Sequence, residues 1–216
     1  CEPMKQARPD ILVTGFGPFP RVRVNPTTAL AKAVTKRLRA AGFAAEGLIL
    51  ETSYAGGLPR LRARLAEARP RAILMLGLAA RARKIRVELF GRGHASPLHP
   101  DASGATPTAR PLPAALPLRT TASPQAALAA VRRRGLRSAL SPSAGRYLCD
   151  ACYAAALRAN RSSGVPVIFI HVPWLRPAPG TKPKARVAAF RPHAATLAAS
   201  LAAMGVDLAR RGRKPG

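Results

Sequence analysis

The sequence is short of cysteine and contains no long apolar run. Its 216 residues include three cysteines, Cys1, Cys149 and Cys152, which are too few and too unevenly placed for the disulfide framework of a small secreted protein. No stretch approaches the roughly 18 consecutive apolar residues that a membrane-spanning helix requires. These absences predict a protein without a membrane span, for which a reducing cytoplasm is the default location.

The first ten residues, CEPMKQARPD, lack the charged-then-apolar pattern of a signal peptide. A chain that opens on Cys1 is also compatible with a lipoprotein whose signal peptide has been removed. A displaced gene start or a trimmed sequence would give the same opening, so all three interpretations stay open here.

Acidic residues are scarce, with 9 Asp and Glu against 36 Lys and Arg, which gives a net charge of +27. Such a charge attracts nucleic acid and other anionic surfaces whatever the main task of the protein. The basic residues are scattered in small groups, as on solvated helix faces, and only residues 210 to 214 form a compact run. Aromatic side chains, on which bases stack, make up 5% of the chain. We therefore expect a solvated, arginine-rich surface and no specific nucleic-acid partner.

Apolar periodicity in the first half alternates between strands and helices. The run ILVTGF ends in a Gly/Pro cluster, as a buried strand does, and Asn25 followed by Pro26 gives a helix its N-cap and first residue. The pattern predicts strands at 11 to 16, 47 to 50 and 71 to 79, helices at 26 to 41 and 58 to 68, and a more exposed strand or hairpin arm at 84 to 92.

The second half repeats this alternation after a long loop from 94 to 123. It predicts helices at 124 to 134, 144 to 159 and 185 to 204, and strands at 137 to 140 and 165 to 173. Alternating strands and helices indicate an α/β fold, a three-layer α/β/α sandwich around a mostly parallel twisted sheet. We expect a single domain over 1 to 216, with a folded core from 10 to 205 and a basic, disordered tail from 206 to 216.

Cys149 is a candidate nucleophile because it lies in the opening turns of a predicted helix that Ser143 could cap. The positive end of a helix dipole lowers the pKa of a thiol and favours the reactive thiolate. A lone cysteine on a helix is more often a small buried apolar residue.

His171 and Glu88 are two further candidates. His171 ends the strand VIFIH, at the carboxyl edge of the sheet where ligands of open α/β sheets bind, although it could simply cap its own loop. Glu88 is an acid retained in a segment where arginine would be expected at the surface, so a specific partner is expected, either an arginine or a residue of the site.

Cys149 and Cys152 also form a C-x-x-C pair, which occurs in redox dithiols and metal sites. A metal site would need a second pair of ligands, and a thioredoxin-like motif would lie earlier in a smaller fold. Cys152 is best explained as a core residue, and a disulfide between Cys152 and Cys149 could switch off the nucleophile. We expect no metal and no cofactor.

Four segments, in order, carry a family resemblance: TGFGPFPRVRVNPT (14 to 27), LGLAARARKIRVE (76 to 88), SPSAGRYLCD (141 to 150) and FIHVP (169 to 173). They resemble the pyroglutamyl peptidase I, or pyrrolidone-carboxylate peptidase, family over residues 10 to 205. The first, third and fourth segments are specific together, and the second is looser. The resemblance implies a three-layer α/β/α fold and a cysteine peptidase that removes an N-terminal pyroglutamyl group.

The resemblance also assigns roles to individual residues. It implies a catalytic triad of Cys149 as nucleophile, His171 as base and Glu88 as the group that orients the histidine. It further implies that Phe16, Phe19 and Tyr147 pack around the lactam ring, and that Asn25 serves the site as well as its helix; without the resemblance, the two phenylalanines read as core residues.

Three positions depart from the family pattern. Asp150 stands where the family usually has Asn, and its charge would oppose thiolate formation. Leu78 replaces a frequent Gln, and the stretch GRGHASPLHPD replaces an Asn and Arg-containing segment, so that Arg92 would have to supply any missing support for the oxyanion.

We therefore expect a pyroglutamyl peptidase that acts on peptides with an N-terminal pyroglutamate and that could form a homo-oligomer. The alternatives are a divergent hydrolase or inactive relative of the same fold and, from another class, a basic nucleic-acid-binding protein. Thiol-reagent sensitivity distinguishes the peptidase, and steeply salt-dependent binding unaffected by Cys149→Ala distinguishes the nucleic-acid-binding protein.

Overall fold

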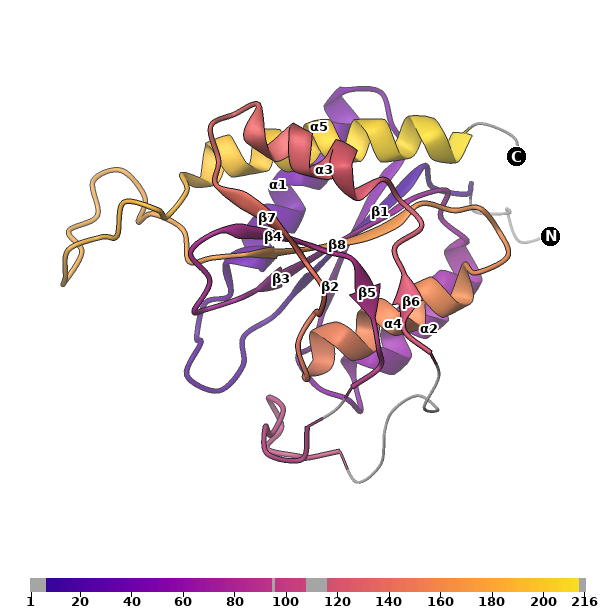
Figure 1. Ribbon diagram of the computed structural model, residues 1–216, viewed down its shortest axis with the longest axis horizontal. Coiled ribbons are helices and arrows are strands. Elements are labelled where there is room, and N and C mark those ends of the chain that lie inside the picture. The colour runs from indigo at the N-terminus through magenta and orange to yellow at the C-terminus, as the bar shows by residue number, and fades with distance from the viewer. Residues whose placement is uncertain (1–6, 95, 108–115, 214–216) are drawn as a thin grey trace, which may run out of the picture.

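A computed structural model of the protein describes residues 7–94, 96–107 and 116–213 (Figure 1). The helices and strands follow one another as β1 (Ile11–Phe16), α1 (Pro26–Ala40), β2 (Ala45–Leu50), α2 (Gly57–Ala68), β3 (Ile73–Leu78), β4 (Ile85–Glu88), β5 (Phe90–Gly91), β6 (Leu118–Arg119), α3 (Pro124–Arg132), β7 (Ser138–Ser141), α4 (Leu148–Ala159), β8 (Val167–Val172) and α5 (Ala194–Arg213). In this described part, no helix is long and apolar enough to cross a membrane.

Six strands form one twisted sheet in the order β2-β1-β3-β8-β4-β7. Strands β2, β1, β3 and β8 are mutually parallel, whereas β4 runs antiparallel to β8, with Arg86 opposite His171 and Glu88 opposite Phe169. Strand β7 pairs in parallel with β4, with Ser141 opposite Glu88. The carboxyl ends of the four parallel strands therefore meet the start of β4 at one edge of the sheet.

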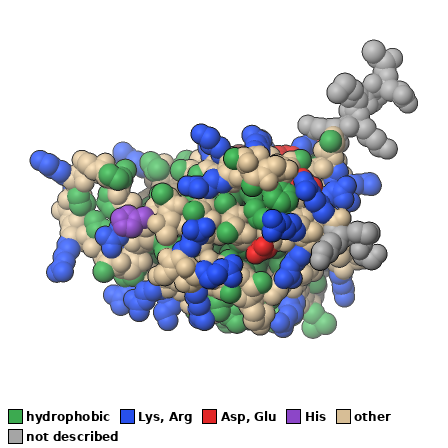
Figure 2. Space-filling model, turned by 90° about the horizontal axis from the view of Figure 1, so that it is seen from above, with side chains coloured by type: hydrophobic (Ala, Val, Ile, Leu, Met, Phe, Trp, Pro, Cys, Tyr) green, Lys and Arg blue, Asp and Glu red, His purple; other side chains and the backbone are tan. Residues whose placement is uncertain are grey.

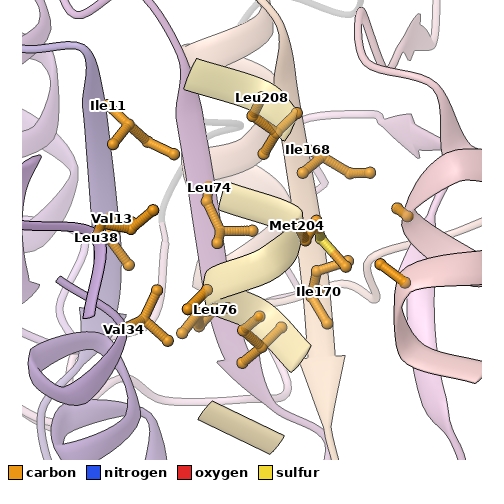
Figure 3. Close-up of a cluster of buried hydrophobic side chains, with 14 of the residues drawn as sticks. Ile11, Val13, Val34, Leu38, Leu74, Leu76, Ile168, Ile170, Met204 and Leu208 are labelled. Atoms are coloured by element: carbon orange, nitrogen blue, oxygen red, sulfur yellow. The ribbon is translucent and has the colours of Figure 1, made fainter. Parts of the chain in front are cut away.

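Helices cover both faces of this sheet, α1, α3 and α5 on one face and α2 and α4 on the other (Figure 1). Alternate residues of each strand face opposite sides, so each face has its own apolar cluster. Figure 3 shows the first cluster, in which Met204 and Leu208 of α5 pack over Leu74 and Ile168. Burial of such side chains contributes about 1.5–3 kcal/mol each. The expected three-layer α/β/α sandwich is confirmed.

Two predicted helix boundaries were wrong. Helix α4 begins at Leu148 with Tyr147 as its N-cap, and not at 144 with Ser143 as its cap. Gly145 has φ 92°, a left-handed conformation that interrupts a helix, and the Ser143 hydroxyl instead accepts the Gly145 N–H. Helix α5 begins at 194 rather than 185, because Pro192 and His193 immediately precede it in a non-helical conformation.

The predicted disordered tail is also corrected. Helix α5 continues to Arg213, because Leu208 and Ala209 extend its buried stripe and Arg213 binds Asp10 beside strand β1. Only residues 214–216 of the expected tail lie outside the described residues. Within the long segment predicted as a loop, the short strand β6 pairs with β5.

Candidate active site

His171 and Glu88 form a buried pair at the edge of the sheet. The Nδ1 atom of His171 lies 2.8 Å from Oε1 of Glu88, and the two side chains come from the adjacent antiparallel strands β8 and β4. Glu88 is fully buried and His171 is 6% exposed, so little water competes for this hydrogen bond. The partner of Glu88 is therefore the histidine and not an arginine, and the pairing at Nδ1 leaves Nε2 as the free ring nitrogen.

Helix α4 is fixed directly against this pair. The hydroxyl of Tyr153 donates a hydrogen bond of 3.0 Å to the backbone carbonyl of Glu88. The Tyr153 ring centroid lies 5.5 Å from that of Phe169, which in turn lies 4.7 Å from the imidazole of His171. Cys149 precedes Tyr153 by one turn and shares its side of the helix. The charges of Glu88 and Asp150 act on the Cys149 thiol, which places it near the Glu88 carboxylate.

Gly77 leaves room for the histidine. It lies opposite His171 in the β3–β8 ladder. A Cβ atom at Gly77 would come within 2.7 Å of the Phe169 ring and 3.0 Å of Cδ2 of His171. The absence of a side chain at this position thus leaves room for both rings beside strand β3.

The thiol of Cys149 does not have the lowered pKa that its place in the helix predicted. Burial, followed by the carboxylates of Glu88 and Asp150, raises the pKa of Cys149 to about 12, while its own backbone N–H acts in the opposite direction. The helix start is present, but desolvation and two nearby negative charges outweigh it. The Cys149 thiol is therefore neutral at rest.

Asp150 is a structural hydrogen-bond acceptor beside Cys149. One carboxylate oxygen accepts the backbone N–H of Arg92 at 2.9 Å, and the other accepts that of His94 at 2.6 Å. Burial raises the pKa of Asp150, and these two hydrogen bonds oppose the rise. The residue fastens the segment after strand β5 to the start of α4.

Arg92 is held close to the same place. Its guanidinium donates to the carbonyl of Pro142 at 3.3 Å and lies 5.6 Å from the Phe90 ring centroid. Pro142 opens the segment that leads into α4, so Arg92 joins the segment after β5 to the segment between β7 and α4.

An open hollow of about 510 Å³ lies beside the start of helix α4, on the β1 side of His171. Phe19 and Tyr147, two of the residues predicted to contact a ring, line it together with the apolar side chain of Leu98. The wall that holds Leu98 is anchored by Asp101, whose buried carboxylate accepts the backbone N–H groups of Tyr54, Ser103 and Ala105. Burial alone would raise the pKa of Asp101, but the hydrogen bonds lower it.

Phe16 and Asn25 lie beneath this hollow rather than in its lining. Phe16 is 2% exposed in the apolar core under α4. Asn25 caps α1 by accepting the Thr27 N–H, and its amide donates to the carbonyl of Gly17. The side chain of Asn25 therefore holds the two ends of the loop that carries Phe19.

Tyr54 is a site residue that the sequence did not indicate. Its ring makes an edge-to-face contact with Tyr147, with centroids 6.0 Å apart. Both tyrosine hydroxyls are buried and have no hydrogen-bond partner among the described residues. Burial raises the pKa of both, to about 12 for Tyr147. A single tyrosine after a strand carries no recognisable pattern, so only the packing identifies Tyr54.

Cys152 faces the core and not the site. Its side chain is fully buried in the cluster under α4, and both Cys149 and Cys152 are free thiols. The prediction that Cys152 is a core residue agrees with this position.

Residues 9–204 match the family model for pyroglutamyl peptidases. The chain belongs to the pyroglutamyl peptidase family, a family of cysteine peptidases. The pyrrolidone-carboxylate peptidase of Streptomyces coelicolor is 32% identical over 206 residues, which cover 93% of this chain and 92% of the relative. That of Deinococcus radiodurans is 33% identical over 176 residues, 76% of this chain and 78% of the relative.

Solved structures agree with this family membership. The pyrrolidone carboxyl peptidase of Thermococcus litoralis superposes with a TM-score of 0.77 at 27% identity, and the match covers 94% of this chain and 96% of that structure. Pyroglutamyl peptidase I of Bacillus amyloliquefaciens gives a TM-score of 0.74 at 22% identity over 95% and 98% of the two chains, which shows the shared fold.

Proposed function

We propose that the protein hydrolyses the amide bond that follows an N-terminal pyroglutamyl residue, with Cys149 as nucleophile, His171 as base and Glu88 as the group that orients the imidazole. The observation that carries the proposal is the 2.8 Å contact between Nδ1 of His171 and Oε1 of Glu88. It keeps a proton on Nδ1, so that Nε2 carries the lone pair that a general base needs.

Proton transfer and attack belong to one event in this scheme. Because the pKa of the Cys149 thiol is about 12 at rest, few molecules hold a thiolate before substrate binds. Nε2 of His171 takes the thiol proton as sulfur bonds to the pyroglutamyl carbonyl carbon, and the imidazolium then protonates the departing amine. Water next attacks the thioester with His171 again as base, which frees pyroglutamate and restores the thiol.

Backbone N–H groups at the start of α4 are the proposed donors to the oxyanion. The first turn of a helix leaves its N–H groups without intrahelical partners, and Cys149 lies in that turn. Arg92 is already bound to Pro142, so its guanidinium supports the chain segment before the nucleophile and is not assigned to the oxyanion.

The hollow between Phe19 and Tyr147 is the proposed ring site. A flat lactam fits between aromatic and apolar walls. Phe16 and Asn25 contribute from below, by supporting the loop that carries Phe19.

Asp150, one of the departures from the family pattern, does not favour an inactive relative. The carboxylate of Asp150 accepts hydrogen bonds from two backbone N–H groups, which gives it a structural role. The two free thiols fit the cytoplasmic location that we propose.

The test is hydrolysis of a fluorogenic pyroglutamyl amide by the reduced protein. We expect turnover that Cys149→Ala and His171→Ala abolish and that Glu88→Gln lowers by about 10²–10⁴-fold. Cys152→Ala, which removes the neighbouring thiol, is the matched control and keeps most of the activity. A folded wild-type protein that cleaves no pyroglutamyl substrate would overturn the proposal.

A further inference from the structure

A second hollow of about 510 Å³ lies on the side of His171 away from the proposed ring site. One wall carries four cations from the β3–β4 connection and the start of β4, namely Arg81, Arg83, Lys84 and Arg86. The facing wall includes Ser141 and Pro142 at the end of β7. We call this hollow the cationic groove. All four cations are exposed, and none of them forms an ion pair with any residue that the structure describes.

The strand register sets the cationic groove directly beside the proposed catalytic pair. Arg86 lies opposite His171 in the β4–β8 ladder, and Ser141 lies opposite Glu88 in the β4–β7 ladder. Because side chains alternate along a strand, Arg86 leaves β4 on the same face as Glu88. Arg86, which lines the groove, is therefore the next residue on the Glu88 side of β4, two positions nearer the start of the strand.

The order of the strands separates the two hollows. Phe19 follows β1, and the groove lies over β4 and β7, with β3 and β8 between them. His171 stands between the hollow that fits a lactam ring and the hollow that carries positive charge. A substrate with its ring against Phe19 and its scissile bond at Cys149 has its leaving peptide on the groove side.

We propose that the cationic groove binds the peptide chain after the pyroglutamyl residue and favours substrates with a carboxylate there, either an acidic side chain or a nearby C-terminus. This inference rests on the proposed function. Arg83 lies 5.5 Å from the Phe190 ring centroid, a contact that holds its guanidinium in place before substrate arrives.

Nucleic acid is the less suitable ligand for the groove. Its lining contains no aromatic side chain on which a base could stack, among residues the structure describes. Lys and Arg are also spread over the whole face in Figure 2 with little acid between them, so general attraction for polyanions does not single out this site. What distinguishes the groove is its place beside His171.

The experiment compares kcat/KM for matched peptides at low salt, with released pyroglutamate measured by mass spectrometry. The set comprises pGlu-Ala-Ala-amide, pGlu-Glu-Ala-amide, pGlu-Lys-Ala-amide and the free acid pGlu-Ala-Ala. We expect the Glu peptide to exceed the Lys peptide by roughly fivefold or more, and the difference to shrink at 1 M salt. Comparison of the free acid with its amide separates a C-terminal carboxylate from a side-chain one.

The variant Lys84→Gln/Arg86→Gln should bring the Glu-to-Lys ratio close to one. Its control, Lys36→Gln/Arg37→Gln, removes the same two residue types from exposed positions on α1, across the sheet, and should keep the ratio.

Equal loss of the Glu-to-Lys preference in both variants, or turnover without charge preference in the wild type, would overturn the groove alone. Peptide turnover without charge preference, together with single-stranded DNA binding lost only in the Lys84/Arg86 variant, would overturn it in favour of nucleic acid. No cleavage of any pyroglutamyl peptide would overturn the proposed function and the groove with it.

Discussion

The carboxylate of Asp150 accepts the backbone N–H of His94 at 2.6 Å, so the residue next to Cys149 holds a chain segment more than fifty positions earlier. The same carboxylate accepts the N–H of Arg92 and raises the pKa of Cys149. One side chain therefore both braces the site and adds, after burial and Glu88, to the raised pKa of its thiol.

Asp150→Asn separates these two roles. The amide keeps one acceptor and loses the charge, so we expect the pKa of the Cys149 thiol to fall while stability drops by about 1–3 kcal/mol, since one backbone donor loses its partner. The pH dependence of iodoacetamide alkylation reports the thiol pKa, and urea unfolding reports stability. Asp207→Asn, on helix α5, is the charge-matched control; an unchanged thiol pKa in Asp150→Asn would contradict this assignment.

Alkylation of the wild-type protein should show no plateau near neutral pH. With the pKa of the Cys149 thiol at about 12, the rate should rise about tenfold per pH unit from pH 7 to pH 10, because only the thiolate reacts. Cys152→Ala restricts the measurement to Cys149. A rate that levels off below pH 8 would instead indicate a stable thiolate–imidazolium pair.

Gly77→Ala should impair the reaction more than the fold. The added methyl group would press on Phe169 and on Cδ2 of His171, at a cost of about 1–3 kcal/mol, and would turn the imidazole away from Cys149. We expect kcat to fall by roughly tenfold or more while the melting temperature changes by only a few degrees. Gly17→Ala is the control, since its added Cβ meets only an ordinary contact of 3.6 Å; equal losses of kcat would refute the assignment.

The ion pair between Asp10 and Arg213 should make the free energy of unfolding depend on pH in the acidic range. The hydrogen bond from Arg213 lowers the pKa of Asp10. A carboxylate with a lowered folded-state pKa adds stability above its unfolded pKa of about 3.9, and the contribution is lost as pH falls through the folded value. Asp10→Asn should therefore lower the melting temperature at pH 7 but match the wild type once the pH has fallen below the folded-state pKa of Asp10. A difference that persists there would show that the charge is not the cause.

The sequence predicted the layers of the fold because their signals are local. Helix α1 follows from Asn25, Pro26 and its apolar spacing, and strands β1 and β8 follow from uninterrupted apolar runs. The direction of β4 could not be predicted, because alternation in a strand is the same whichever way its neighbour runs. The end of helix α5 was predicted too early in the chain, because the contact between Arg213 and Asp10 joins distant positions.

The site divides in the same manner. His171 and Glu88 were indicated by position at a strand end and by the rarity of acids, and the structure brings them into contact. The direction of the Cys149 pKa shift was wrong, because helix position is local whereas burial and the nearness of Glu88 depend on the assembled fold. Tyr54 and the cationic groove are likewise products of packing.

The position of helix α5 has a consequence for how the chain is made. Met204 and Leu208 cover the sheet face that begins with Ile11, so most of the chain separates the two halves of this core (Figure 3). During synthesis, helices α1 and α3 can cover their own parts of this face, but the part under α5 stays uncovered until α5 has left the ribosome. Ribosome-bound chains that stop before α5 should therefore remain sensitive to protease.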